Sequence, residues 1–400
     1  MFMNYSFNLK TYAALLSLIF VGCVEESSIQ FEVTNHLDLD RSSETVEIDL
    51  DLLESEKALK LVAGKTYKVS EVSSNTEVIS QLSDVDGDGS ADVLLFQPEL
   101  MGNTSKTYTV ELKNIETQSD SIPTCYSRFV PERTDDYAWE NDRVAFRTYG
   151  PIAQKMVEDG VPGGTLSSGI DAWLKRVDFP IINKWYKKEL ETDGSYHEDD
   201  GEGLDNFHVG SSRGVGGIAV KVDSTYQFSK NFTEYQTIEN GPLRTSFWLK
   251  YASWDAGNKK ITETKYISLD RGSNLSKFRI EIEGTDTISV GLTLHEKDGE
   301  ITATPEQGWM SYWEPHDDSE LGLGVVVPSS TFLGYDEYVT DKADLSNLFA
   351  QVKVVDGEAV YYAGFGWKKS KQYTTKEEWT KYLQQFATKV NNPLEVKKVE

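Results

Sequence analysis

Apolar and polar residues alternate along much of the chain with a period of two, which is the pattern of strands that have one buried face. Near the amino terminus this alternation is clear at 31–33, 45–48 and 108–112. Turn-forming sequences rich in Gly, Asn and Asp separate the later strands, at 239–242, 255–258 and 270–274. Strands and turns at this spacing predict a large antiparallel β-sandwich.

One helix is predicted close to the carboxyl terminus. Thr374 or Thr375 can cap it, with Glu377 or Glu378 three residues further on. Its apolar residues recur at helical spacing and predict packing against the sandwich: Trp379, Tyr382, Leu383 and Phe386. We therefore predict an all-β protein with a small N-terminal β-domain at 28–120, a polar linker, and a larger domain at 130–400 that ends in this helix.

Composition narrows the class of protein. A chain of 400 residues exceeds the usual size of a single core, which favours two domains. The formal net charge of -25 argues against nucleic acid and against docking on anionic lipid, because both require a basic surface. Aromatic residues are abundant, with 9 Trp, 20 Tyr and 17 Phe, which favours strands and supplies rings on which sugars can stack.

The first residues read as a targeting segment. Lys10 precedes an apolar run at 12–21, which is too short to span a bilayer and has the length of a signal-peptide core. The run ends in Phe20-Val21-Gly22-Cys23, which resembles a bacterial lipobox. We expect cleavage of a signal peptide at 1–23, a lipid anchor on Cys23, and a location at the outer membrane, in the periplasm or at the cell surface. Cys125 is then left without a disulfide partner.

An acidic loop in the N-terminal domain has the spacing of a calcium site. Carboxylates occupy relative positions one, three, five and nine, with glycine at six for the sharp turn. The residues are Asp84, Asp86, Asp88 and Asp92. Position twelve is Leu95, so the usual bidentate glutamate is missing. Either another segment completes the shell of a structural calcium ion, or the loop is an acidic turn without metal.

The segment 196–217 concentrates proton carriers, carboxylates and six glycines. Glycine lets a loop bend and approach a ligand closely. His197, His208 and Arg213 bring imidazoles and a guanidinium into one loop, which suits acid/base work on an anionic substrate. The alternative is a solvated acidic turn with histidines held by backbone carbonyls.

A period-two segment before this loop offers further candidates. Arg143, Arg147 and Tyr149 fall on one face, while Val144 and Phe146 fall on the other. The polar face either lines a groove, where it presents a cation and a phenol to a ligand, or it is the solvent side of the sandwich. Between the two segments, the basic residues Lys175 and Arg176 lie close to Trp173 in the sequence.

Metal binding is a rival account of the histidines. His197, His208 and His295 could together hold a divalent ion, with loop carboxylates as further ligands. The sequence contains no short H-x-H or H-x-x-x-H spacing that would support this account. His316 is placed at the rim of the site, and we expect no organic cofactor.

Four motifs in this order resemble the family of domain of unknown function 4861. They are W-E-N-D-R-V-A-F-R-T-Y-G-P at 139–151, S-G-I-D-A-W-L-K-R at 168–176, Y-H-E-D-D-G-E-G-L-D at 196–205 and S-R-G-V-G-G at 212–217. The resemblance implies a component of a polysaccharide-utilisation system for uronate-containing glycans, with a mutarotase-like super-sandwich. It also implies an oligosaccharide dehydratase of the kind that acts in ulvan breakdown.

The implied reaction removes water from a non-reducing-end glucuronic or iduronic acid and leaves a 4,5-unsaturated uronate. A cation must hold the carboxylate while the C5 proton is abstracted, for which Arg147 and Arg213 are candidates, with Lys175 or Arg176 in reserve. His197 or His208 has the intrinsic pKa of a base. Tyr149 or Tyr196 is suited to protonate the departing hydroxide. Trp173 and His295 are expected to contact the substrate.

Three alternatives remain open at the level of sequence. A polysaccharide lyase uses the same chemistry with a glycosidic oxygen as leaving group. A glycoside hydrolase would use two carboxylates, such as Glu202 and Asp205, as acid and nucleophile. A glycan-binding lipoprotein would use Trp173 and Trp185 as stacking platforms without turnover. The sequence does not specify the uronate, its linkage or sulfation, or the oligomeric state.

Overall fold

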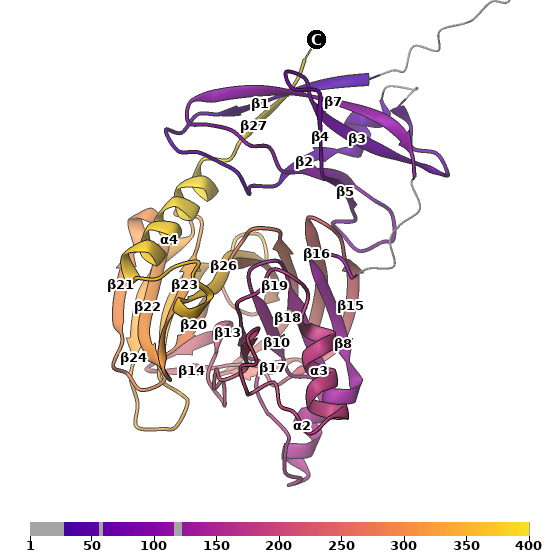
Figure 1. The fold of residues 1–400 in the computed structure, drawn as a ribbon. Helices are drawn as coiled ribbons and strands as arrows, with labels where there is room; N and C mark the ends of the chain where they lie inside the picture. Colours follow the sequence, from indigo (N-terminus) through magenta and orange to yellow (C-terminus); the bar gives the residue numbers. More distant parts are fainter. Residues whose placement is uncertain (1–27, 56–58, 116–121, 400) are drawn as a thin grey trace, which may run out of the picture.

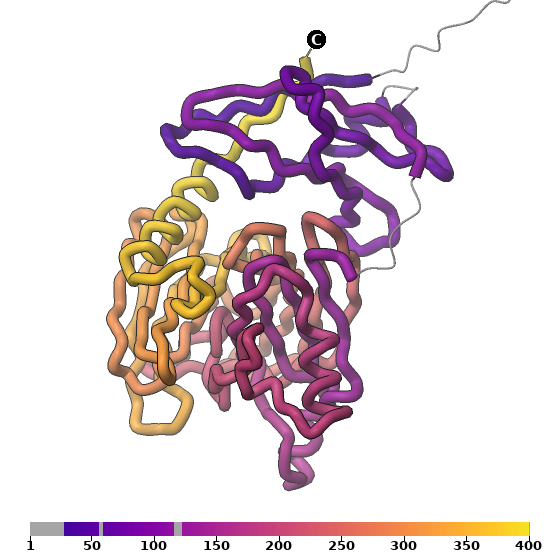
Figure 2. The backbone as a smooth tube through the Cα atoms, viewed as in Figure 1, coloured from indigo at the N-terminus to yellow at the C-terminus, as the bar shows by residue number. Residues whose placement is uncertain are grey.

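The structure is a computed structural model that describes residues 28–55, 59–115 and 122–399 (Figure 1). The predicted signal peptide and the lipobox cysteine, Cys23, lie outside the described residues. Strands make up 48% of the chain and helices 13%, so the all-β prediction is confirmed. None of the helices described is long and apolar enough to cross a membrane. Figure 2 shows a small N-terminal unit stacked on a larger sandwich.

The N-terminal unit contains two sheets and the short helix α1 (Leu50–Glu54). The first sheet has the order β27-β1-β7-β3-β4, with β27 (Glu395–Lys398), β1 (Ser28–Asn35), β7 (Thr104–Asn114), β3 (Lys65–Glu71) and β4 (Thr76–Val78). The second has the order β2-β6-β5, with β2 (Val46–Asp49), β6 (Val93–Phe96) and β5 (Ser80–Ser83). Their apolar faces enclose a separate core that includes Phe31, Val33, Tyr67 and Phe96.

The last strand of the chain belongs to this N-terminal unit. β27 runs antiparallel to β1, and Val396 lies opposite Val33 (Figure 1). Leu394 and Val396 pack against the N-terminal core. The N-terminal unit is therefore built from both ends of the chain, and the segment 28–120 by itself lacks one strand of its sheet.

The larger part is a sandwich whose wall is a nine-stranded antiparallel sheet. Its order is β15-β16-β18-β19-β26-β23-β22-β21, with β17 paired to β18. The strands are β15 (Phe232–Glu239), β16 (Arg244–Tyr251), β17 (Trp254–Ala256), β18 (Lys259–Asp270), β19 (Leu275–Glu283), β21 (Glu300–Thr304), β22 (Trp309–His316), β23 (Ser319–Val326) and β26 (Glu358–Trp367).

Two five-stranded sheets face this wall. One has the order β12-β11-β10-β9-β8, with β8 (Tyr126–Val130), β9 (Asp136–Glu140), β10 (Ala145–Thr148), β11 (Asp171–Lys175) and β12 (Gly203–Leu204). The other has the order β14-β13-β20-β25-β24, with β13 (Val215–Val222), β14 (Thr225–Gln227), β20 (Thr287–Thr293), β24 (Phe332–Tyr338) and β25 (Asn347–Lys353). One continuous apolar core joins all three sheets, for example through Phe146, Val290 and Ile280.

The predicted C-terminal helix is α4 (Lys376–Asn391). The Thr375 hydroxyl caps it by accepting a hydrogen bond from the Glu378 amide. Trp379 and Leu383 are buried against β23, and a Cβ at Gly322 would meet the Trp379 ring at 2.5 Å. Glycine at that position thus allows the helix to approach the sheet closely. Two shorter helices, α2 (Pro151–Glu158) and α3 (Ile182–Glu191), lie beside the β8–β12 sheet (Figure 1).

The two faces of β10 separate as the period-two pattern predicts. Phe146 and Val144 enter the sandwich core, while Ala145 faces a second apolar cluster on the other side of the sheet. That second cluster contains Trp173, Trp185 and other residues of α3 and the 196 loop. On the polar face, Arg147 is therefore largely covered by these elements, whereas Arg143 is only partly buried and donates to Asn274 Oδ1 and Gln372 Oε1.

Candidate functional site

A cavity of about 570 Å³ opens where β10 ends and the loop 197–211 crosses the sheet. Arg147, Tyr149, His197 and His208 all line it, although they come from two segments about fifty residues apart. Asp205 and Asp344 complete its polar wall. The cavity therefore brings together a guanidinium, a phenol, two imidazoles and two carboxylates, all within reach of one ligand.

Arg147 is the centre of a buried charge cluster behind the cavity wall. Its guanidinium donates to Asp171 Oδ2 from Nε at 3.0 Å and from Nη2 at 2.6 Å. Nη2 also donates to Asp205 Oδ2 at 2.8 Å, and Nη1 donates to the Tyr196 hydroxyl at 3.0 Å. Asp136 Oδ2 lies 3.6 Å from Nη1. The cation that the sequence offers for a uronate is thus already paired with protein carboxylates.

Burial shifts the carboxyl groups of this cluster towards neutrality. It raises the pKa of Asp171 to about 7, and the neighbouring charge of Asp205 adds to the shift while Arg147 opposes it. Burial raises the pKa of Asp136 to about 6 and also raises the pKa of Asp205. Carboxyl groups of this kind can carry a proton near neutral pH, which ordinary surface aspartates cannot.

Tyr149 connects the cluster to the cavity. Its side chain is nearly buried, and its hydroxyl donates to Asp171 Oδ2 at 3.2 Å. Burial, followed by the charge of Asp171, raises the pKa of this phenol well above its ordinary value. Tyr149 therefore stays protonated at neutral pH and can donate a proton, with a carboxyl group directly behind it.

Both histidines of the glycine-rich loop face the cavity, and each is oriented by one partner. His197 Nδ1 lies 2.5 Å from the Asp205 carbonyl oxygen. Since a carbonyl only accepts, Nδ1 carries the proton and Nε2 is the basic nitrogen. His208 Nε2 lies 3.1 Å from Asp344 Oδ1, and a Cβ at Gly210 would meet the Asp344 carboxylate. The positive φ and missing side chain of Gly210 thus let Asp344 reach His208.

The other predicted site residues do not line this cavity. Tyr196 and Trp173 are buried behind it, with Trp173 among Trp185, Tyr186 and Tyr196. Because its ring is covered, Trp173 cannot act as an exposed stacking platform. The Tyr196 hydroxyl accepts from Arg147 and also from Arg133 Nε at 3.2 Å. These two side chains support the charge cluster from within.

The remaining predicted cations are engaged elsewhere. Lys175 Nζ is fully buried and donates to Glu140 Oε2 at 2.8 Å and to the Asn141 and Phe179 carbonyls. Arg176 lies near the surface, with Nη2 2.9 Å from Asp199 Oδ1. Arg213 is buried, donates to Ser168 Oγ at 2.8 Å and stacks 3.7 Å from the centre of the Phe228 ring. Burial lowers the pKa of Arg213 to about 9.

His295 lies behind the cavity wall rather than in it. Its Nδ1 is 2.5 Å from Glu314 Oε1, and its Nε2 is 3.0 Å from the His208 carbonyl oxygen. Among the described residues, the ligand atoms that lie close enough to His295 to share one metal ion belong to Glu314 and His316, and not to His197 or His208.

A family model described as domain of unknown function (DUF4861) matches residues 33–396. The chain belongs to this DUF4861 family. A relative from Formosa agariphila, described as uncharacterized protein P7, is 54% identical over 391 residues, which cover 96% of this chain and 98% of the relative. The resemblance noted from the four sequence motifs is therefore confirmed.

Two solved structures from Enterococcus faecalis align with 93% of this DUF4861 chain. A protein in glycosyl hydrolase family 38 aligns with a TM-score of 0.50 and 11% identity, and an α-mannosidase aligns with 0.47 and 12% identity. The chain spans a little under half the length of these proteins, 47% and 46% respectively. The likeness to the first concerns the fold only.

Several residues of this DUF4861 site were not identified from the sequence. Asp171 falls inside one of the family motifs, but its position opposite Arg147 depends on the pairing of β10 with β11. Asp136 and Asp344 gave no local signal at all. One sequence signal could have identified Asp171. It is an acidic residue at the start of an otherwise apolar strand, and a carboxylate buried there requires a partner.

The acidic loop of the N-terminal unit is folded around its own carboxylates. Carboxylate oxygens of Asp84, Asp86 and Asp88 lie within 4.8 Å of one another. Asp84 accepts from the Gly87 and Gly89 amides, whereas Asp92 Oδ2 accepts from the Val85 amide at 2.7 Å. Leu95 is buried in β6 and offers no oxygen from its side chain. Three of the four predicted ligands are thus grouped, far from the cavity in the sequence and on a different unit.

Proposed function

We propose that this protein is an oligosaccharide dehydratase that eliminates water from a non-reducing-end uronic acid of ulvan-like oligosaccharides. The observation that carries the proposal is a single cavity that is lined by a protonated phenol, Tyr149, and by two oriented imidazoles, His197 and His208. Elimination next to a carboxylate needs a base on one side and a proton donor on the other. The family resemblance of the motifs, two of which contain Tyr149 and His197, supports the same reaction.

In the proposed reaction His197 Nε2 removes the C5 proton. The C4 hydroxyl leaves with the proton of the Tyr149 hydroxyl, so that one water is released and a C4=C5 double bond forms. Asp171, whose pKa burial raises to about 7, can in its protonated form then return a proton to the Tyr149 oxygen. The cycle closes when His197 releases the C5 proton to solvent and Asp171 takes up a proton from solvent. His208, paired with Asp344, is a second base within the same cavity.

The substrate carboxylate must be neutralised for C5 to lose its proton. Arg147 lines the cavity but faces three aspartates, Asp136, Asp171 and Asp205. Each aspartate that takes up a proton shifts the charge of the cluster by +1. Because burial raises the pKa of all three, the cluster can adjust to an incoming uronate by protonation.

A glycoside hydrolase that uses Glu202 and Asp205 is less compatible with the arrangement. Glu202 is held by Lys184 and Trp185 in a small separate pocket, while Asp205 lines the main cavity. A retaining or inverting pair must flank one glycosidic bond. The two carboxylates do not share a space in which a bond can lie between them.

The test is incubation of purified protein with glucuronate- and iduronate-ended oligosaccharides, followed by ultraviolet absorbance and mass spectrometry. The expected result is new absorbance from the conjugated uronate and the loss of one water without chain cleavage. Chain cleavage with the same absorbance would show a lyase. New reducing ends without absorbance would show a hydrolase, and binding without any product would show a glycan-binding protein; each of these results would overturn the dehydratase proposal.

The predicted lipid anchor sets where this reaction would take place. Attachment at Cys23 would hold the enzyme at the outer membrane. Metabolic labelling with a fatty-acid probe tests this directly. Label on the wild type that is lost in Cys23→Ser would support the anchor, and equal labelling of both proteins would overturn it.

A further inference from the structure

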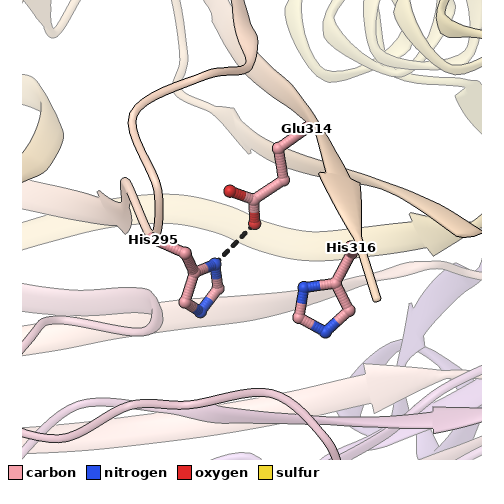
Figure 3. A group of neighbouring side chains, drawn as sticks. All are labelled: His295, Glu314 and His316. Atoms are coloured by element: carbon pink, nitrogen blue, oxygen red, sulfur yellow. Dashed lines mark hydrogen bonds and ion pairs between the residues drawn. The ribbon is translucent and has the colours of Figure 1, made fainter. Parts of the chain in front are cut away.

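Two histidines and a glutamate meet behind the loop that forms one wall of the cavity. Glu314 and His316 lie two residues apart on β22, so they project from the same face of the strand, and His295 follows β20. One ring nitrogen of each histidine and one oxygen of Glu314 lie within 4.8 Å of one another. Figure 3 shows His295 turned towards Glu314, with the His316 ring beside them.

The hydrogen bonds of His295 define its tautomer. Nε2 lies 3.0 Å from the His208 carbonyl oxygen, which can only accept, so Nε2 carries a proton. In the neutral ring, Nδ1 then carries an unprotonated lone pair, and it lies 2.5 Å from Glu314 Oε1. Two such electron-rich atoms repel each other at that distance unless a proton lies between them or a cation binds both.

The surroundings leave further ligand atoms without partners. Among the described residues, neither Glu314 Oε2 nor His316 Nε2 has a hydrogen-bond partner, and both atoms are buried. Glu314 is fully buried and His316 nearly so. Buried polar atoms normally have a partner, and leaving one without a partner costs about 1–3 kcal/mol. A proton shared between His295 and Glu314 satisfies only that pair, so it does not account for the free atoms.

We propose that His295, Glu314 and His316 bind one divalent transition-metal ion, with zinc as the expected ion. Two imidazoles and one carboxylate are a common ligand set of zinc, which leaves one position open for water or a ligand. Calcium and magnesium prefer sets made of oxygen only. The His208 carbonyl supplies the outer contact that orients a metal-bound imidazole.

The site adjoins the cavity but does not depend on the proposed reaction. The Phe207 ring lies 4.6 Å from the His295 ring and 6.2 Å from the His316 ring, centre to centre, and Phe207 also lines the cavity. A bound ion would therefore fix the back of the loop that presents His208. Ligands at roughly 2.0–2.2 Å from a tetrahedral zinc ion lie farther apart than the present 2.5 Å between His295 Nδ1 and Glu314 Oε1, so small rotations must separate these two side chains.

Isothermal titration of zinc into the full chain, stripped with chelator and returned to calcium-containing buffer, tests the proposal. Excess calcium occupies the acidic loop, so that zinc binding to the loop does not contribute to the measured heat. We expect one zinc ion per chain, and an affinity at least about a hundredfold lower in His316→Ala and in Glu314→Gln, since even outer-shell losses cost 10–100-fold. His36→Ala is the control, because His36 pairs with Glu395 on the surface.

Absence of stoichiometric zinc binding to the wild type, or equal affinity in both ligand variants, would overturn the proposal. Circular dichroism shows whether the variants are folded. X-ray absorption of the zinc-loaded wild type needs no variant: scattering from two imidazoles supports the site, and a shell of oxygen ligands alone overturns it. Neither readout involves turnover, so the result stands apart from the outcome of the dehydratase assay.

Discussion

Arg147 on β10 and Asp171 on β11 are direct cross-strand partners, and the guanidinium donates twice to a single carboxylate oxygen, Asp171 Oδ2. Asp171 Oδ1 has no hydrogen-bond partner among the described residues. The oxygen that Arg147 holds is also the one that accepts from Tyr149. This one atom therefore couples the buried cation to the phenol at the cavity.

Removal of Arg147 should destabilise the fold strongly. Arg147→Ala leaves Asp171 and Asp205 buried without their cation, and breaking a buried pair typically costs 3–5 kcal/mol. Arg147→Lys should retain part of the stability, because an ammonium group supplies the positive charge but not the planar guanidinium that donates two parallel hydrogen bonds. Urea denaturation at neutral pH measures the free energy of unfolding. Arg176→Ala, which breaks a partly exposed pair, is the control and should cost about 1 kcal/mol or less.

Stability should fall as pH rises from about 4 to about 7. Burial raises the pKa of Asp171 to about 7 and of Asp136 to about 6, whereas an unfolded aspartate titrates near roughly 3.9. In this window the folded protein binds more protons than the unfolded chain, so each rise in pH favours unfolding. Asp171→Asn should flatten the dependence. Melting temperatures of the wild type and of Asp171→Asn, measured across this pH range, test the prediction. The same pH dependence in both proteins would contradict it.

Loss of the Tyr149 hydroxyl should slow the reaction without unfolding the protein. Tyr149→Phe removes the proton donor and its hydrogen bond to Asp171, and acid/base groups contribute about 10²–10⁴-fold. We expect kcat for uronate dehydration to drop at least about a hundredfold with little change in KM. Tyr335→Phe, at a surface tyrosine of β24 that is 49% exposed, should keep full activity.

His197 should be required for turnover in the same way. Its Nε2 is the basic nitrogen, because Nδ1 donates to the Asp205 carbonyl. His197→Ala should lower kcat by about 10²-fold or more, and His36→Ala should not. Rates for the three proteins on the same oligosaccharide decide this. Near-normal turnover of His197→Ala would move the role of base to His208.

Calcium should stabilise the N-terminal unit through Asp84, Asp86 and Asp88. An ion that binds only the folded state at a hundredfold excess over its Kd adds about 2.7 kcal/mol. Asp88→Asn keeps an oxygen for the Ser90 amide but removes the charge, so it should weaken calcium binding. Calorimetric titration and melting with and without calcium measure this. An unchanged melting temperature of the wild type would identify the loop as an acidic turn without metal.

A charge in β27 should destabilise the N-terminal unit. Val396 lies opposite the fully buried Val33, so Val396→Asp places a carboxylate against the core. We expect a loss of about 2–4 kcal/mol for that unit, in the range of a buried unpaired charge or a truncated core residue. Thermal unfolding measures the loss. Val399→Asp, at a side chain that is 41% exposed, is the control and should cost little.

The sequence by itself determined the fold class and the chemistry of the loops. Strand periodicity, turn residues and the Thr375 cap are local signals, because they depend on neighbours a few residues away. They were sufficient to predict the β-sandwich and the C-terminal helix, whereas the family was indicated by the resemblance of four sequence motifs. The residue types and their spacing also selected Arg147, Tyr149, His197 and His208, which the cavity brings together.

Only the tertiary structure decided which groups are paired and which are free. Asp171 and Asp205 reach Arg147 from 24 and 58 residues away, and His295 meets Glu314 from 19 residues away. Lys175 and Trp173 look available in the sequence, yet folding buries both completely. Burial and long-range strand pairing set the pKa of each carboxyl and the accessibility of each cation, and neither can be read from local pattern.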